Sequence, residues 1–261
     1  MKILTYCMGI LLFLTACKSN ENLSTNSTDT LTYNYDSLIK ISSITAKNYL
    51  DIEDTTAAKI IFPKFKSDIL NESIHKQLLG VFGPEEPAKS ISELASNFIE
   101  GYERFRTEIP ERPQTWYLNI KAKVLFQNPK YLSLEVRSEE YAGGAHGNLF
   151  IKYLNYDPKT YAPLILDDFL LPNSTPKLIQ IAEKKFRENE GLTPNQSLEN
   201  YFFEDAKFSL PANYRLTEEG LEFLYNNYEI KPYSDGITIL VLPYASIMDL
   251  LKSKFKINNK N

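Results

Sequence analysis

The sequence predicts an α+β fold in which antiparallel sheets pack against amphipathic helices, arranged as two small subdomains of related size. Three stretches have apolar residues at the three- and four-residue spacing of a helix: 68–79, 91–105 and 178–186. Three others alternate apolar and polar residues with the period of a strand: 116–126, 132–136 and 148–156. Helices that are collected apart from the strands favour this class over a doubly wound parallel sheet.

The N-terminus has the features of a secretory signal peptide. One positive charge, Lys2, precedes an apolar stretch from Ile3 to Leu14. This stretch is shorter than the roughly 20 residues that a membrane-spanning helix needs. The run Leu14-Thr15-Ala16-Cys17 resembles the lipobox of bacterial lipoproteins, so we expect residues 1–16 to be removed and Cys17 to carry lipid, palmitate included. The protein is then secreted and lipid-anchored in the cell envelope, with the outer membrane and the periplasmic or surface face left open.

Cysteine content and charge argue against several classes of function. The other cysteine, Cys7, lies in the segment expected to be removed, so no thiol would remain for a disulfide, a metal site or a nucleophile. The formal net charge is −4, and loss of Lys2 makes it one unit more negative. Nucleic-acid binding would call for a basic chain instead. We therefore expect no metal, no cofactor and no nucleic-acid partner, membrane contact through the lipid alone, and a monomer.

Composition divides the chain into a tether and a folded part. Lys18 to Asp36 is rich in Ser, Thr and Asn and has few large apolar residues, so residues 17–40 are interpreted as the lipidated Cys and a flexible tether. The chain beyond the tether is long enough for two small subdomains. The predicted division is 41–140 for the N-terminal α+β subdomain, 141–254 for the C-terminal α+β subdomain and 255–261 for a tail.

The elements of the N-terminal half have clear sequence signals. Ser90 and Glu93 form a capping box at the start of a helix whose apolar stripe runs from Ile91 to Phe105. A shorter helix is predicted from Asp68 to Leu79. The period then changes to two, which predicts a β-hairpin around Asn128-Pro129-Lys130 and a third strand from Asn148 to Tyr156.

The C-terminal half repeats these signals. Leu178 to Phe186 is predicted to be helical, with Glu183 and Arg187 as an exposed i,i+4 pair. Short strands are expected around Tyr214, Leu221–Tyr225 and Ile237–Leu242, and a last helix near Tyr244.

A glycine-rich loop is the most unusual stretch of the chain. Tyr141-Ala142-Gly143-Gly144-Ala145-His146-Gly147-Asn148 lies between two predicted strands, and its glycines allow either a tight loop or a ligand cradle. Three roles remain open: a loop that His146 holds through hydrogen bonds, a ligand contact, and catalysis by His146. The other histidine, His75, is far away in sequence, and no nucleophile or metal motif accompanies either one. We therefore expect no catalytic residue. The candidate binding residues here are Tyr141, Gly143, Gly144, His146 and Asn148.

A second candidate segment is Tyr228 to Gly236, which connects two predicted strands. Its candidate binding residues are Tyr228, Pro232 and Tyr233, and the two tyrosines are either core residues or rigid contact residues. Both candidate segments carry turn-forming Gly and bring Tyr or His to polar surroundings. We predict that Gly143–Asn148 and Lys231–Gly236 are neighbours and form one recognition surface.

Several of these runs together resemble a known family. They are the loop 141–148, Leu166-Asp167-Asp168-Phe169-Leu170, the run from Leu216 to Leu221, Tyr228-Glu229-Ile230, Pro232-Tyr233 and Pro243-Tyr244. They are similar to the paired extracytoplasmic domain of uncharacterised function in the lysozyme-sensing anti-sigma factor RsiV. The same domain precedes the catalytic domain of PdaC-type peptidoglycan deacetylases, and the resemblance covers about Ile41 to Lys252, with residues 41–140 PdaC-like and residues 141–254 RsiV-like.

The resemblance implies a role in binding. RsiV-like proteins have a cytoplasmic segment and a transmembrane helix, and PdaC-like enzymes have a deacetylase domain; none of these is recognised here. We therefore expect a non-catalytic cell-envelope lipoprotein that binds a wall-associated ligand, either a lysozyme-type muramidase or peptidoglycan. The two alternatives are a hydrolase acting on cell-wall material and a purely structural envelope lipoprotein.

Overall fold

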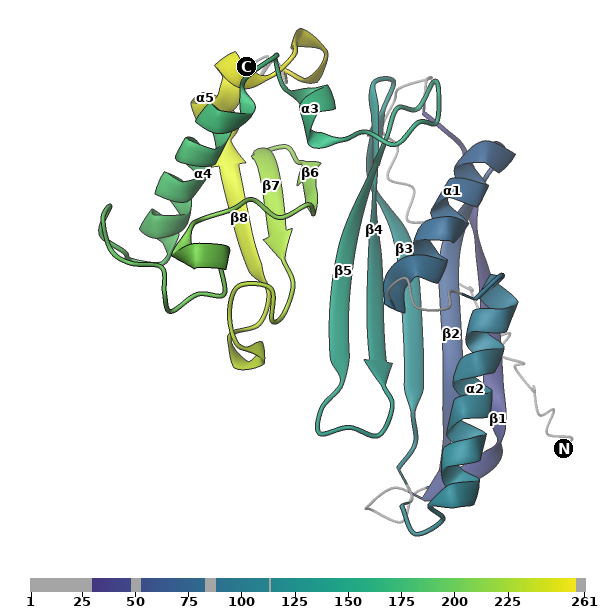
Figure 1. The fold of residues 1–261 in the computed structure, drawn as a ribbon. Helices are drawn as coiled ribbons and strands as arrows, with labels where there is room; N and C mark the ends of the chain where they lie inside the picture. The colour runs from purple at the N-terminus through teal and green to yellow at the C-terminus, as the bar shows by residue number, and fades with distance from the viewer. Residues whose placement is uncertain (1–29, 48–52, 83–87, 113, 257–261) are drawn as a thin grey trace, which may run out of the picture.

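The N-terminal part of the molecule is a five-stranded sheet with two helices on one face (Figure 1). The computed structural model describes residues 30–47, 53–82, 88–112 and 114–256. The strands, in their order across the sheet, are β1 (Tyr33–Lys47), β2 (Glu53–Phe65), β3 (Tyr117–Asn128), β4 (Tyr131–Tyr141) and β5 (Asn148–Tyr156). The helices are α1 (Asp68–Leu79), extended by the 3₁₀ turn η1 (Gly80–Phe82), and α2 (Ile91–Glu108).

Both helices begin at the residues that their sequence predicts. The Ser67 hydroxyl caps α1 by accepting the N–H of Leu70 at 3.3 Å. The Ser90 hydroxyl caps α2 by accepting the N–H of Glu93 at 3.0 Å, while the Glu93 carboxylate accepts the N–H of Lys89 at 2.6 Å. No helix among the described residues has the length and apolar character needed to cross a membrane.

A core of alternating strand residues lies between this sheet and its helices. Strands β2 to β5 contribute alternate residues, because successive side chains point to opposite faces. The fully buried members include Ile60 of β2, Leu118 of β3 and Leu134 of β4. Leu70, Ile74 and Leu78 of α1 cover them. The predicted α+β class is therefore confirmed.

One strand pair departs from the antiparallel arrangement. β2 and β3 run parallel, from Ala57 opposite Tyr117 to Ile61 opposite Lys121. The reason is the connection: α1 and α2 lie between β2 and β3 in the chain, and this long crossover returns the chain to the end of the sheet where β2 began. The first sheet is mixed as a result.

The predicted tether ends earlier than expected. Residues 33–40 belong to β1, which pairs with β2 from Tyr33 opposite Phe65 onward. The aromatic ring of Tyr33 packs on that of Phe65, with centroids 5.1 Å apart. Composition misled here, since Tyr, Thr and Ile favour strands even in a segment rich in polar residues. The predicted signal peptide and Cys17 lie outside the described residues.

The C-terminal part is a three-stranded antiparallel sheet with helices on one side (Figure 1). Its strands are β6 (Tyr214–Leu216), β7 (Gly220–Tyr225) and β8 (Thr238–Pro243). The helices and 3₁₀ turns are α3 (Leu166–Phe169), α4 (Thr175–Asn189), η2 (Glu204–Ala206), η3 (Tyr233–Asp235), α5 (Tyr244–Ile247), η4 (Met248–Leu250) and η5 (Ser253–Phe255). Phe186 of α4 and Phe223 of β7 are buried in its core. Glu183 and Arg187 form the predicted pair at 2.8 Å.

Two predicted boundaries need correction. The boundary at residue 140 falls inside the first sheet, because β5 pairs with β4 from Asn148 opposite Glu140 to Tyr156 opposite Leu132. The chain leaves this sheet only after Tyr156. The predicted tail begins at 255, yet Phe255 is buried against the C-terminal core and its ring lies 4.7 Å from that of Phe169.

Candidate binding site

The β4–β5 and β7–β8 connections emerge at the same end of the molecule and touch (Figure 1). The His146 ring stacks on the Tyr233 ring, with centroids 3.9 Å apart and an interplanar angle of 21°. The Tyr228 ring lies 5.5 Å from that of Tyr233, and the Tyr228 hydroxyl is 3.5 Å from His146 Nε2. The predicted proximity of the two loops is therefore confirmed. We call His146, Tyr228 and Tyr233 the two-loop cluster.

Hydrogen bonds and close packing fix the shape of the glycine-rich loop. The Tyr233 hydroxyl donates to the carbonyl of Gly147 at 2.7 Å, and His146 Nδ1 is 2.9 Å from the same oxygen. A Cβ on Gly147 would lie 2.8 Å from the hydroxyl of Tyr117 and 3.0 Å from the carbonyl oxygen of Glu140, so only glycine fits without a shift. Gly147 therefore has a packing role.

Gly143 has a similar role on the other side of the loop. Its φ of +82° suits glycine, and a Cβ there would lie 2.9 Å from the indole Nε1 of Trp116. The sequence pattern places Trp116 on the buried face of a strand. In the structure it precedes β3 and packs on Tyr102 and Phe105 of α2, with ring centroids 5.7 and 5.0 Å apart. The indole therefore ties the loop to α2.

The other sequence candidates near the cluster differ in their burial and packing. The Tyr141 ring is half-buried and stacks on Tyr117, with centroids 6.1 Å apart. Gly144, Asn148 and Pro232 are exposed. A Cβ at Gly144 would meet nothing closer than 3.8 Å, so packing does not require glycine there.

Tyr228 is an exposed ring of the cluster. The side chain is 57% exposed, and its backbone has a φ of +66°. Such a conformation is uncommon for a bulky residue and costs roughly 1–2 kcal/mol. It is held by a tight turn in which the N–H of Glu229 donates to the carbonyl of Asn226 at 3.1 Å and the Glu229 carboxylate accepts the N–H of Asn226 at 2.8 Å. The turn thus keeps a strained, solvent-facing tyrosine in one position.

A cavity of about 420 Å³ adjoins this tyrosine. It is lined by Phe150, Lys152, Ala212, Asn213, Asn226, Asn227, Tyr228 and Glu229. Phe150 is 37% exposed, the Oδ1 atom of Asn227 is buried and has no hydrogen-bond partner among the described residues, and partial burial raises the pKa of the Glu229 carboxyl. An unpartnered buried oxygen beside a cavity is a site where a ligand or water can donate a hydrogen bond.

Two asparagine side chains dock the C-terminal subdomain on the free edge of β5. Asn226 accepts the N–H of Ile151 at 2.7 Å and donates to the Ile151 carbonyl at 3.0 Å. Asn213 accepts the N–H of Tyr153 at 2.7 Å and also donates to the Ile151 carbonyl at 2.7 Å. These amides replace the backbone partner that an edge strand lacks. Because Asn226 also begins the turn that holds Tyr228, docking and loop position are coupled.

A buried polar network reinforces the same interface. Glu222 of β7 accepts the hydroxyl of Tyr153 at 2.8 Å and binds Arg215 through two bonds of 2.7 and 3.1 Å. Burial and the adjacent carboxylate raise the pKa of Tyr153 far above its usual range. Tyr131 of β4 donates to Asn155 at 2.6 Å and accepts the N–H of Leu216 at 3.0 Å. These bonds fix the C-terminal subdomain against the first sheet.

The chemistry available at the cluster is stacking and hydrogen bonding. It presents the two rings of Tyr228 and His146, and the cavity that Tyr228 helps to line lies beside them. Among the residues that the structure describes, no group of three or more His, Cys, Asp or Glu side chains could hold a metal ion. Sequence reasoning found the three cluster residues but missed Asn213, Asn226 and Phe150. The only local signal was the Asn-Asn pair that follows Tyr225.

Two family models match successive parts of the chain. Residues 51–149 match a family described as deacetylase PdaC. Residues 167–245 match a family described as a protein of unknown function (DUF3298). The first match covers most of the five-stranded sheet, and the second covers the C-terminal part from α3 into α5.

A curated protein is similar to more than half of the chain. The peptidoglycan-N-acetylmuramic acid deacetylase PdaC of Bacillus subtilis (strain 168) is 22% identical over 187 residues, which are 69% of this chain and 40% of that enzyme. The chain therefore spans about two fifths of the length of this curated relative.

Two solved structures have a similar fold. A crystal structure of a DUF3298 family protein from Pseudomonas aeruginosa PAO1 has a TM-score of 0.69 at 20% identity and covers 87% of this chain and 96% of its own. A member of that family from Bacteroides fragilis NCTC 9343 has a TM-score of 0.62 at 23% identity, with the same coverage. These likenesses show that the arrangement of the two sheets is shared.

Proposed function

We propose that this chain is a non-catalytic binding module of the cell envelope, anchored through Cys17. Its two-loop cluster binds a wall-associated ligand, which is a lysozyme-type protein or peptidoglycan. The neighbouring cavity lined by Phe150 and Lys152 extends the contact surface.

The main support for a binding role is the aromatic cluster in which the exposed rings of His146 and Tyr228 pack on the half-buried ring of Tyr233. Aromatic rings of this kind supply a large contact area and lose little conformational freedom on binding. Tyr228 remains in a strained backbone conformation with its ring in solvent, which core packing alone does not require. A ligand that covers this ring would account for both features.

The nature of the ligand is supported by resemblance. The curated relative is named as a deacetylase of peptidoglycan N-acetylmuramic acid, and part of it is similar to this chain. The loop 141–148 and the runs around Tyr228 and Tyr233 also resemble the lysozyme-binding ectodomain of RsiV. Both resemblances support a ligand from the cell-wall environment. Because fold does not determine ligand, direct binding has to be measured.

Binding is tested with the full chain carrying Cys17→Ala, immobilised and exposed to lysozymes and to soluble peptidoglycan fragments. His146→Ala and Tyr228→Ala should each weaken binding by about 1–3 kcal/mol, because each removes a central ring. The control is Tyr35→Ala, which removes a ring of similar exposure (48%) from the edge strand β1. Equal losses in all three variants, or no binding to either ligand class, would reject the proposed site. Release of wall fragments that depends on His146 would favour the hydrolase.

Anchoring is tested separately by palmitate labelling. The wild-type chain should incorporate label and fractionate with membranes, whereas Cys17→Ala should do neither. A Cys17→Ala chain that stays firmly bound to membranes would reject the lipid anchor.

A further inference from the structure

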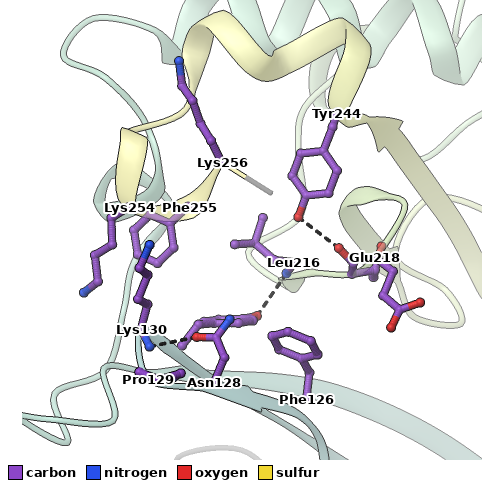
Figure 2. A pocket seen from close by; sticks show the side chains of 12 residues that line it. Phe126, Asn128, Pro129, Lys130, Leu216, Glu218, Tyr244, Lys254, Phe255 and Lys256 are labelled. Atoms are coloured by element: carbon purple, nitrogen blue, oxygen red, sulfur yellow. Dashed lines mark hydrogen bonds between the residues drawn. The ribbon is translucent and has the colours of Figure 1, made fainter. Parts of the chain in front are cut away.

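A second cavity lies at the end of the molecule opposite the two-loop cluster (Figure 1), and Figure 2 shows it from close by. Its volume is about 570 Å³, within the range of roughly 300–1,000 Å³ that is usual for small-molecule sites. It is bounded by the β3–β4 hairpin, the end of β6, the start of α5 and the segment around η5. Both subdomains therefore contribute to its walls.

The walls of this cavity are aromatic and rigid. Tyr131, Leu216, Tyr244 and Phe255 line it, although each is otherwise buried in the core. Their polar atoms are already partnered: the Tyr131 hydroxyl accepts the N–H of Leu216 at 3.0 Å, and the Tyr244 hydroxyl donates to the carbonyl of Thr217 at 2.9 Å. The walls thus offer a ligand mainly apolar surface.

The charges at the rim are unevenly distributed. Lys130, Lys254 and Lys256 accompany a single carboxylate, Glu218, although the whole chain is acidic. Figure 2 shows Lys130 and Lys254 on one side and Glu218 on the other. Lys254 binds Asp157 at 2.5 Å, whereas no ion pair within the described part of the chain involves Lys130. An anionic group would therefore lie on the side of Lys130, with the attached apolar body against Leu216 and Tyr244.

We propose that this cavity binds an amphiphilic anion: an acyl chain that ends in a carboxylate or a phosphate. The aromatic walls account for the chain, and the ammonium group of Lys130 accounts for the head group. The site shares no lining residue with the cavity beside Tyr228, so it is independent of the function proposed above.

The test uses calorimetric titration of the full chain carrying Cys17→Ala, so that no attached lipid competes. Dodecanoate and dodecyl phosphate, both kept below their micellar concentrations, distinguish the two head groups. At least one should bind saturably with one site per chain. Dodecyltrimethylammonium has the same chain and the opposite charge, and should bind at least about tenfold more weakly.

Two lysine variants make the test specific. Lys130→Glu should weaken binding of the anion by about tenfold or more, and Lys130→Ala by a smaller factor in the same direction. Lys121→Glu makes the same charge change on an exposed position of β3 and should alter affinity by less than about twofold. His146→Ala should leave this binding unchanged, which separates the site from the two-loop cluster.

Three results would overturn the proposal. They are equal binding of the cationic and anionic amphiphiles, equal losses in Lys130→Glu and Lys121→Glu, and association that occurs only with micelles. Thermal unfolding of each variant confirms that the loss of binding is not a loss of fold.

Discussion

The subdomain interface and the two-loop cluster both contain side chains that can form hydrogen bonds, but they use them in opposite ways. At the interface, hydrogen bonds to β5 satisfy the side chains of Glu222, Asn213 and Asn226. At the cluster, Tyr228 and His146 are exposed, and the ring of Tyr228 has only one hydrogen-bonding neighbour among the described residues, at 3.5 Å. The first region fixes geometry, and the second presents groups to solvent.

This difference suggests how the molecule positions its loops. The β4–β5 loop belongs to one subdomain and the β7–β8 loop to the other, so their relation depends on docking along β5. Satisfied polar groups at a buried interface rigidify it, whereas an unpartnered one would be costly. We expect substitutions at the interface to lower stability first, and substitutions at the cluster to lower binding alone.

The largest effect is expected for Glu222→Ala. The variant removes the carboxylate that binds Arg215 and accepts the Tyr153 hydroxyl. The Glu222 side chain is only 10% exposed. Breaking a buried ion pair by removing one partner costs about 3–5 kcal/mol. Urea unfolding measures the loss. Glu139→Ala is the control, because it breaks an Arg137 pair whose side chains are about 40% exposed, and such a pair contributes about 0–1 kcal/mol. Similar losses of unfolding free energy in both variants would contradict the distinction between the buried interface and an exposed ion pair.

Alkaline pH provides a second test of the interface. Burial raises the pKa of Tyr131 to about 12, against about 10 in an unfolded chain. Below pH 10 both states keep the proton, so stability is unaffected. Between pH 10 and 12 only the unfolded state ionises, and the folded state loses about 3 kcal/mol of relative stability.

Tyr131→Phe isolates this contribution from the other tyrosines with raised pKa values. At neutral pH the variant should cost about 1–3 kcal/mol, because the hydrogen bonds to Asn155 and Leu216 are lost. Above pH 10 the unfolding free energy of the variant should fall less steeply with pH than that of the wild type. The difference in slope should correspond to about one proton. Parallel curves of unfolding free energy against pH would contradict the assignment.

Asn226→Ala is expected to have an intermediate effect on both properties. It leaves the N–H of Ile151 without its partner, while the Ile151 carbonyl keeps the bond from Asn213, and we expect a cost of about 1–3 kcal/mol of unfolding free energy. The variant keeps the two backbone bonds of the turn before Tyr228 but detaches this turn from β5, so ligand binding should weaken. The adjacent Asn227→Ala is the matched control, because the Oδ1 atom of Asn227 has no partner to lose among the described residues. If Asn226→Ala were no more destabilising than Asn227→Ala, the edge-docking role would be wrong.

Local patterns predicted those parts of the molecule that local chemistry decides. The spacing of Leu70, Ile74 and Leu78 indicated the limits of α1, and the turn after Tyr156 indicated the end of β5. β1 escaped prediction because its stability comes from pairing with β2, and its composition alone resembles a tether. No element was expected over Glu53–Phe65 either, although Thr56, Ala58, Ile60 and Phe62 alternate.

The candidate site also contains residues that the sequence predicted and residues that it did not. Glycine density and turn residues pointed to His146, Tyr228 and Tyr233, and the structure brings these rings together. Asn213 and Asn226 could not be found from sequence, because an asparagine replaces a strand partner only after the two subdomains have docked. Whether the cluster binds a ligand stays a prediction.

The smallest and sharpest effect is expected from the backbone of Tyr228. At a φ of +66°, a residue with a Cβ is strained, and glycine is not. Tyr228→Gly should therefore be more stable than Tyr228→Ala by about 1 kcal/mol, although glycine is normally the less favourable residue. Both variants should lose ligand binding to the same extent, because both lack the ring. Thermal and urea unfolding give the first comparison, and titration with the lysozyme or peptidoglycan ligand gives the second. If Tyr228→Gly were the less stable variant, the left-handed turn would carry no strain, and the exposed ring would need no ligand to explain its position.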